Sequence, residues 1–86
     1  MDAIRIDKYT MVQAEDNGEY GWKLVEGWES RDGEFKPNFC KRSFKKGGEE
    51  KTVPVSVKLG PKETAIATLL MLLNEISGDV YSATPF

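Results

Sequence analysis

The stretch Trp28-Glu-Ser-Arg-Asp-Gly-Glu-Phe-Lys-Pro37 decides the fold of this chain. Asp32-Gly33 predicts a tight turn, because these two residue types tolerate turn backbone conformations. The tryptophan before the turn and the phenylalanine after it are typical of strands. Pro37 has no backbone donor, which indicates a sheet edge or a bulge. The stretch therefore predicts two antiparallel strands joined by a tight turn.

Further strands are predicted on both sides of this hairpin. Asp16-Asn17-Gly18 is a second strong hairpin signal. The alternation before it becomes imperfect after Asp7, so a bulge is compatible with the first strand. The last strand alternates cleanly, and Val53, Val55, Val57 and Leu59 are expected to face the core. We expect strands over about residues 3–14, 20–29, 34–45 and 51–59.

One long helix is predicted after the last strand. Gly60 is an acceptable N-cap, Pro61 fits the first helical position, and Gly78 is a good terminator. The helix is expected over about residues 61–77, followed by a tail over 78–86. Its apolar residues cover more of the circumference than a helix lying on one small sheet needs. We therefore expect a homodimer with an interface formed by Ile66, Leu69, Leu70, Leu73 and Ile76.

An alternative is that residues of the same chain cover the second face of this helix. The candidates are Tyr81, Phe86 or the first strand. The tail also ends in Pro85-Phe86, as bacterial single-strand-binding proteins do after an acidic tail. This tail contains only one acidic residue, Asp79, and packing of Tyr81 and Phe86 onto the helix is the preferred interpretation.

The chain is expected to form one α+β domain over residues 1–86. We predict a four-stranded curved antiparallel sheet followed by one C-terminal helix, which dimerises. A chain of 86 residues has only a thin core, so burial in a dimer would help to stabilise it. The single cysteine, Cys40, excludes an internal disulfide, and the first residues do not resemble a signal peptide. With no apolar stretch long enough to cross a bilayer, these features favour the cytoplasm.

Several kinds of chemistry find no support in the residue types present. The chain has no histidine, the commonest general base and metal ligand. Cys40 consequently has no histidine partner, and a zinc site is not expected. The acidic pairs Glu15-Asp16 and Glu49-Glu50 lie at turn signals, where solvated carboxylates are common. We expect a non-enzymatic protein without a catalytic residue, metal or cofactor.

The charge is distributed unevenly along the chain, whose net charge is −2. Residues 1–35 carry four basic and nine acidic side chains, whereas residues 36–51 carry six basic and two acidic ones. Because salt screens charges beyond about 10 Å, a basic segment in an acidic chain can still bind phosphate. The basic segment also contains Phe39 and Phe44, and single-strand binders combine stacking aromatics with cations. The alternative is a solvated hairpin whose lysines keep an edge strand soluble.

The order of elements and two motifs resemble the positive cofactor four (transcriptional coactivator) family and its distant Whirly relatives. In that family a strand ending in tryptophan precedes Gly-Glu-apolar-Lys-Pro, and this chain has Trp28 and then residues 33–37, Gly-Glu-Phe-Lys-Pro. The family's last strand ends in Leu-Asn-Pro-Glu; residues 59–63 here read Leu-Gly-Pro-Lys-Glu. The chain departs from the family in a dozen or more extra residues around 38–51 and in the absence of a helix tryptophan.

This resemblance implies a homodimer that binds single-stranded DNA, or melted duplex, across the sheet surface away from the helices. Lys36 is carried over by motif. Lys23 and Lys58 follow from strand alternation, and charge nominates Lys41, Arg42, Lys45 and Lys46. For the stacking aromatic we choose Phe44, with Phe39 as second choice.

Two function classes follow from these observations. The leading hypothesis is a bacterial or phage protein that binds single-stranded DNA, with RNA as a possible ligand, in replication, recombination or transcription. The rival is a small protein-binding module, such as a phage-encoded inhibitor, whose acidic residues 1–35 dock on a basic partner.

Overall fold

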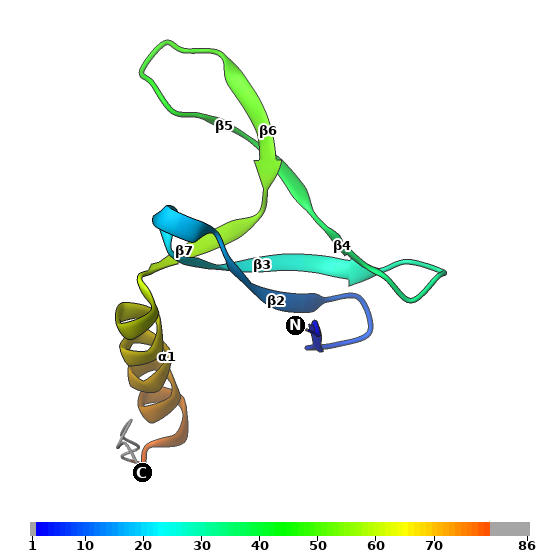
Figure 1. The fold of residues 1–86 in the computed structure, drawn as a ribbon. Helices are drawn as coiled ribbons and strands as arrows, with labels where there is room; N and C mark the ends of the chain where they lie inside the picture. The colour runs from blue at the N-terminus through cyan, green and yellow to red at the C-terminus, as the bar shows by residue number, and fades with distance from the viewer. Residues whose placement is uncertain (1, 80–86) are drawn as a thin grey trace.

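The computed structural model describes residues 2–79 and has an α+β fold with antiparallel strands and one helix after them (Figure 1). The expectations for Tyr81, Pro85 and Phe86 lie outside the described residues. The elements in chain order are β1 (Ile4–Arg5), β2 (Met11–Asp16), the 3-10 helix η1 (Gly18–Tyr20), β3 (Trp22–Glu29), β4 (Phe35–Pro37), β5 (Phe39–Ser43), β6 (Glu50–Pro54), β7 (Ser56–Gly60) and α1 (Lys62–Ser77).

Strand β3 lies at the centre of a five-stranded sheet. Along one edge it pairs with β2, from Trp22 to Gly27, and β1 pairs with β2 beyond it. Its other edge is shared, because β7 pairs with the first half of β3 and β4 pairs with its end. β5 and β6 form a separate two-stranded sheet. The α+β class and the antiparallel pairing are confirmed, whereas the expected single four-stranded sheet is replaced by these two sheets.

The strand expected over residues 3–14 is divided into β1 and β2 by a tight turn. Ile6 and Asp7 both donate their backbone N–H to the carbonyl of Thr10, at 2.9 and 3.3 Å. The Asp7 carboxylate accepts the N–H of Tyr9 at 2.8 Å, and this hydrogen bond lowers the pKa of the Asp7 carboxyl group below its ordinary value. A short polar side chain that bonds its own backbone favours a turn over a strand, which explains the break.

The strands expected over residues 34–45 and 51–59 are also divided, and each break follows a proline. β4 ends at Pro37 and β6 ends at Pro54. Proline lacks an N–H and cannot continue a ladder of backbone hydrogen bonds. After these residues the chain passes between the two sheets, so the β5–β6 hairpin leaves the main sheet to one side (Figure 1).

The helix begins and ends close to the expected residues. Pro61, rather than Gly60, occupies the N-cap position of α1. Gly78 ends the helix in the left-handed conformation and donates its N–H to the Asn74 carbonyl. Within the described chain this 16-residue helix is not long and apolar enough to cross a membrane.

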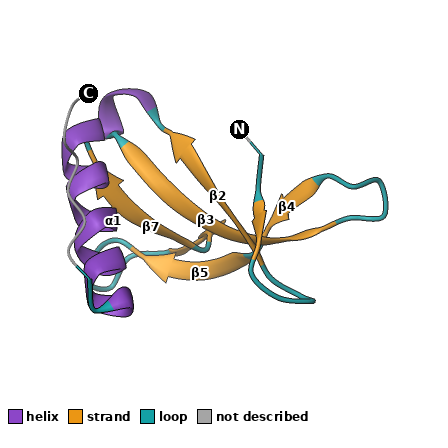
Figure 2. Cartoon of the chain, turned by 90° about the horizontal axis from the view of Figure 1, so that it is seen from below, coloured by secondary structure: helices purple, strands orange, loops and turns teal. Residues whose placement is uncertain are grey.

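Helix α1 extends from the end of β7 on the side of the main sheet opposite the β5–β6 hairpin (Figure 1). Seen from below, α1 and the turn between β3 and β4 lie at opposite ends of the molecule (Figure 2). The helix therefore covers only one end of the sheet. Val57, which we expected in the core, is 61% exposed because the helix does not extend over it.

The core of the described chain is correspondingly small. Its buried apolar side chains are Met11, Val25, Leu59 and Ala65. Met11 pairs with Gly27, which is itself buried, and the Phe35 ring lies over that glycine. A Cβ atom at position 27 would collide with the Phe35 ring and with the carbonyl oxygen of Lys36. Gly27 is therefore required for the approach of β4 to β3.

The substitution Gly27→Ala is expected to destabilise the fold by roughly 2 kcal/mol or more, because the backbone of β4 would have to move. The measurement is urea unfolding followed by circular dichroism. Gly33→Asn serves as the control, since Gly33 has a φ of 82° with open space around it, and asparagine tolerates that conformation. Equal unfolding midpoints for the two variants would contradict the role assigned to Gly27.

Candidate functional site

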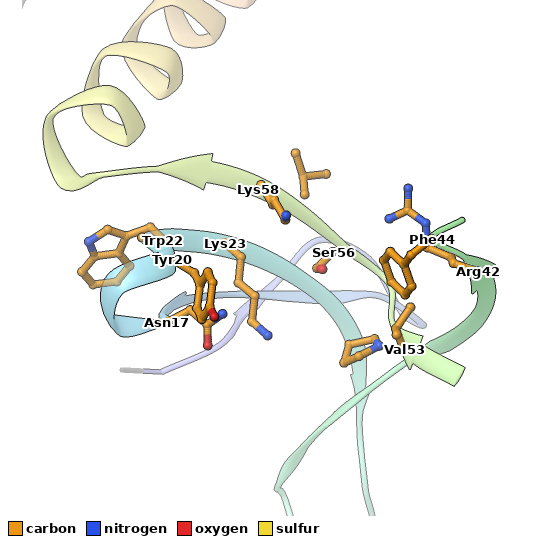
Figure 3. Close-up of a pocket in the computed structure, with 12 residues that line it drawn as sticks. Asn17, Tyr20, Trp22, Lys23, Arg42, Phe44, Val53, Ser56 and Lys58 are labelled. Atoms are coloured by element: carbon orange, nitrogen blue, oxygen red, sulfur yellow. The ribbon is translucent and has the colours of Figure 1, made fainter. Parts of the chain in front are cut away.

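A cleft of about 600 Å³ lies between the main sheet and the β5–β6 hairpin. Its floor comes from neighbouring strands, with Lys23 on β3 and Ser56 and Lys58 on β7. Arg42 on β5 and Phe44 just after it form one wall, and Asn17 and Tyr20 from the β2–β3 connection lie at the other side (Figure 3). The cleft thus joins segments that are far apart in the sequence.

Three cationic side chains line this cleft, and among residues 2–79 no carboxylate does. Lys23 and Lys58 are direct cross-strand partners, so both side chains leave the sheet on the same face. Like charges directly opposite each other destabilise a sheet. Arg42 adds a third positive charge from the hairpin. An arrangement that opposes stability in this way is typical of a functional site.

One carboxylate lies close behind the cleft. Glu15 on β2 is the cross-strand partner of Lys23, and its Oε2 atom lies 3.6 Å from the Lys23 Nζ atom. Within residues 2–79, neither Arg42 nor Lys58 has a carboxylate oxygen within 4.0 Å. Two of the three cations are consequently available to an anionic ligand without breaking an ion pair.

Exposed aromatic rings accompany these cations. Tyr20 is 72% exposed and Phe44 is 66% exposed, although both are large apolar groups. They come from opposite sides of the cleft, and Lys23 lies between them (Figure 3). Trp22 is half-buried and also lines an apolar hollow beside α1, so part of its surface belongs to the fold.

A register shift between Trp22 and Lys23 shapes this end of the sheet. Trp22 pairs with Gly60 and Lys23 pairs with Lys58, which leaves Leu59 without a direct partner on β3. Such a bulge changes the direction in which neighbouring side chains point. On β7 itself, alternation places the exposed Lys58 and the buried Leu59 on opposite faces.

Half of the residues predicted from the sequence meet in this cleft. They are Lys23, Arg42, Phe44 and Lys58. The other four lie elsewhere. Lys41 alternates with Arg42 along β5, and Lys45 lines a smaller hollow of about 250 Å³ at the hairpin tip, next to Lys46.

Lys36, the residue nominated by motif, is not brought into the cleft. It lies on β4, paired with Trp28, and its Nζ atom lies 3.1 Å from a carboxylate oxygen of Glu34. Phe39 is 60% exposed but does not line the cleft either.

Sequence reasoning missed Tyr20, Asn17 and Ser56 as cleft residues. Tyr20 was assigned to the beginning of a strand, whereas it lies in η1, between Gly18 and Gly21, both with positive φ. The pair of glycines around Tyr20 was the sequence signal that could have indicated a turn there instead of a strand. Alternation along the last strand places Ser56 on the same side as Lys58, whereas nothing in the sequence pattern indicates that Asn17 faces the hairpin.

No protein-family model, curated protein sequence or solved structure matches this chain. The kind of ligand that the site can bind is therefore inferred from the geometry of the site alone.

The cleft has the chemistry of an anion site with stacking surfaces. Lysine and arginine donate charge-assisted hydrogen bonds to phosphate oxygens, and arginine can do so with two parallel bonds. Phenylalanine and tyrosine offer planar faces to a flat, unpaired ring system. The residues that the structure describes contain no group of three acidic or cysteine side chains that could hold a metal ion.

Removing one of the facing lysines is expected to stabilise the fold. Lys58→Gln eliminates the like-charge pair with Lys23, which should raise the free energy of unfolding by about 0.2–1 kcal/mol at low salt. The gain should shrink as salt screens the charges. Chemical denaturation at two salt concentrations measures it. Lys36→Gln, which instead removes an attractive pair with Glu34, should give no gain, and a loss of stability for Lys58→Gln would contradict the interpretation.

Proposed function

We propose that this protein is a homodimer that binds single-stranded DNA without catalysing a reaction. The observation that carries the proposal is one cleft that the described part of the chain lines with three cations and two exposed aromatic rings but no carboxylate. Neutralisation of phosphates supplies most of the affinity in such interfaces. The whole chain is acidic, with a net charge of −2, so this local concentration of positive charge supports an anionic ligand at the cleft rather than general charge attraction.

The proposed mechanism divides phosphate contacts from base contacts. Lys23, Lys58 and Arg42 neutralise successive phosphates along the floor and wall of the cleft. Phe44 stacks on an unpaired base, and Tyr20 offers a second stacking surface across the cleft. In a duplex both faces of each internal base are covered by its neighbours, so stacking of this kind selects single strands.

The cleft lies on the face of the main sheet away from α1, which supports dimerisation through the helix without blocking the ligand. On α1 the apolar residues Ile66, Leu69, Leu73 and Ile76 are between 41% and 84% exposed, while Leu70 is half-buried. Burying this surface contributes about 25 cal/mol for each Å² of apolar area. A second copy is therefore the proposed partner of the helix.

Charge reversal inside the cleft is expected to abolish binding. Arg42→Glu combined with Lys58→Glu should lower the affinity for a single strand of about 20 nucleotides more than 100-fold at low salt, because each phosphate contact contributes separately. Fluorescence anisotropy of the labelled strand measures the affinity. Lys8→Glu with Lys62→Glu is the matched control, since it changes the net charge equally at positions outside the cleft.

The salt dependence gives a second readout for the same experiment. Each lost phosphate contact should reduce the slope of log affinity against log salt by about 0.7 for single strands. Equal losses in the cleft variant and the control would indicate general charge attraction and contradict the site. Absence of binding by the unaltered protein at micromolar concentration and low salt would contradict the function and favour the protein-binding module.

Stacking is tested by truncating one ring at a time. Phe44→Ala should weaken single-strand binding by about 1–3 kcal/mol, or roughly 5- to 150-fold, with little change in the salt slope. Phe39→Ala is the control, because Phe39 is similarly exposed but lies outside the cleft. The same titration with a duplex should show no difference between the two variants. A larger loss for Phe39→Ala would assign the stacking surface to the other side of the hairpin.

A further inference from the structure

The single chain exposes more surface than a compact domain of its mass. Its accessible surface area is 7390 Å², whereas a compact folded monomer of 9.7 kDa exposes about 5,100 Å². Its radius of gyration is 15.4 Å, compared with about 12 Å for a compact domain of 86 residues. The excess of about 2,300 Å² in each chain reflects an open shape, to which the projecting β5–β6 hairpin and uncovered apolar surface both contribute.

One part of this surface is an apolar face of the main sheet. Cross-strand pairing places Ile4 beside Val12 and Leu24 beside Val57. Trp28 shares this side with Leu24, since the two residues are four positions apart on one strand, and the exposed Glu26 lies between them on the same side, opposite Val12. We call the five apolar residues the apolar sheet face. Trp28 is 46% exposed, and Val57 is 61% exposed at the edge of the sheet, where it also lines the cleft. Lys23 and Lys58 lie on the opposite side of the sheet from Leu24.

The second uncovered part is a stripe on α1. We call Ile66, Leu69, Leu72, Leu73 and Ile76 the helix stripe; each is more than 40% exposed. At 3.6 residues per turn these positions lie within one arc of the helix, and Met71 lies on the other side of it. Ala65 is the one residue of α1 that the described chain buries.

The two surfaces meet at a corner of the same molecule. A wholly apolar hollow of about 230 Å³ separates the first turns of α1 from the sheet, lined by Ala14 and Trp22 on one side and Ala65, Ile66 and Leu69 on the other. Ala14 pairs with Leu24, so α1 begins on the side of the apolar sheet face. It then runs away from the sheet and contacts mainly β7, which leaves both surfaces uncovered within one chain.

We propose that the helix stripe of a second copy lies on the apolar sheet face, and that the contact is reciprocal. This inference rests on the proposed homodimer and specifies its interface. A two-fold axis makes each contact occur twice, helix on sheet and sheet on helix. Pairing of the two helices alone would cover the stripes and leave Ile4, Trp28 and Val57 in water. Reciprocal docking covers both surfaces, and an area of this size is typical of obligate homodimers, which bury roughly 2,000–5,000 Å² in total.

Mixing two variants tests this arrangement. The sheet variant is Trp28→Glu with Val57→Glu, and the helix variant is Leu69→Lys with Leu73→Lys. All four side chains are already at least 43% exposed in one chain, so the substitutions do not empty its core. Each variant alone should have the solution mass of one 9.7 kDa chain. An equimolar mixture should form a dimer of twice that mass, because one of its two contacts is unaltered and the other pairs Glu with Lys.

Three outcomes would overturn the proposal. A sheet variant that stays dimeric by itself would indicate pairing through the helices alone, and a mixture that stays monomeric would exclude reciprocal contacts. A monomeric unaltered protein would remove the homodimer from the proposed function as well, although DNA binding could still be measured. Met71→Lys, at a position 72% exposed outside the stripe, is the control that should remain dimeric.

A spectroscopic measurement keeps the proposal testable if a variant fails to fold. The chain has two tryptophans, so Trp22→Phe leaves Trp28 as the only one. Its emission should shift to longer wavelength when the dimer is diluted to monomers, because the partner helix no longer covers it. Emission that is unchanged on dissociation would place Trp28 outside the interface and overturn the proposal.

Discussion

Three backbone hydrogen bonds at one point hold the two sheets together. The Glu26 N–H donates to the Val55 carbonyl at 3.0 Å, the Asn38 N–H donates to the Glu26 carbonyl at 3.0 Å, and the Val55 N–H donates to the Asn38 carbonyl at 2.8 Å. Glu26 lies in the middle of β3, where its second edge passes from β7 to β4. Asn38 and Val55 each follow a proline, so the ladder resumes at the first residue able to donate. This junction directs the β5–β6 hairpin out of the main sheet.

The junction lies between two different faces of the main sheet, one charged and one apolar. The hairpin leans over one face, where Lys23 and Lys58 lie, and adds Arg42 and Phe44 to them. On the other face the sheet offers apolar side chains, and α1 begins beside them. Alternation along β3 alone would distribute polar and apolar residues in this way, but only the hairpin turns the charged face into a cleft. The two faces meet at Val57, which belongs to the apolar sheet face and also lines the cleft.

Local signals predicted the parts of this fold that depend on neighbours in the sequence. The turn at Asp32-Gly33, the helix and its end at Gly78, and the common face of Lys23 and Lys58 all follow from propensity and alternation. The divided strands were not predicted, because Pro37 was interpreted as a sheet edge or a bulge rather than as a point where the chain changes sheets. The cleft depends on tertiary placement: Arg42 and Phe44 come from the extra segment, whereas the motif residue Lys36 lies at the far end of the sheet. The position of the Tyr20 ring at the cleft depends on the short 3-10 helix η1, which strand patterns do not reveal.

Attachment of the hairpin at a single point has a consequence for how proteins of this architecture can diverge. Beyond Asn38 and Val55 the hairpin strands pair only with each other, so their length is independent of the main sheet. Inserting or deleting two residues in each strand preserves register and the facing of every side chain, and moves the tip by about 7 Å. The reach of the hairpin beyond the main sheet can thus change through small, paired insertions, while the junction, the sheet and the helix stay as they are.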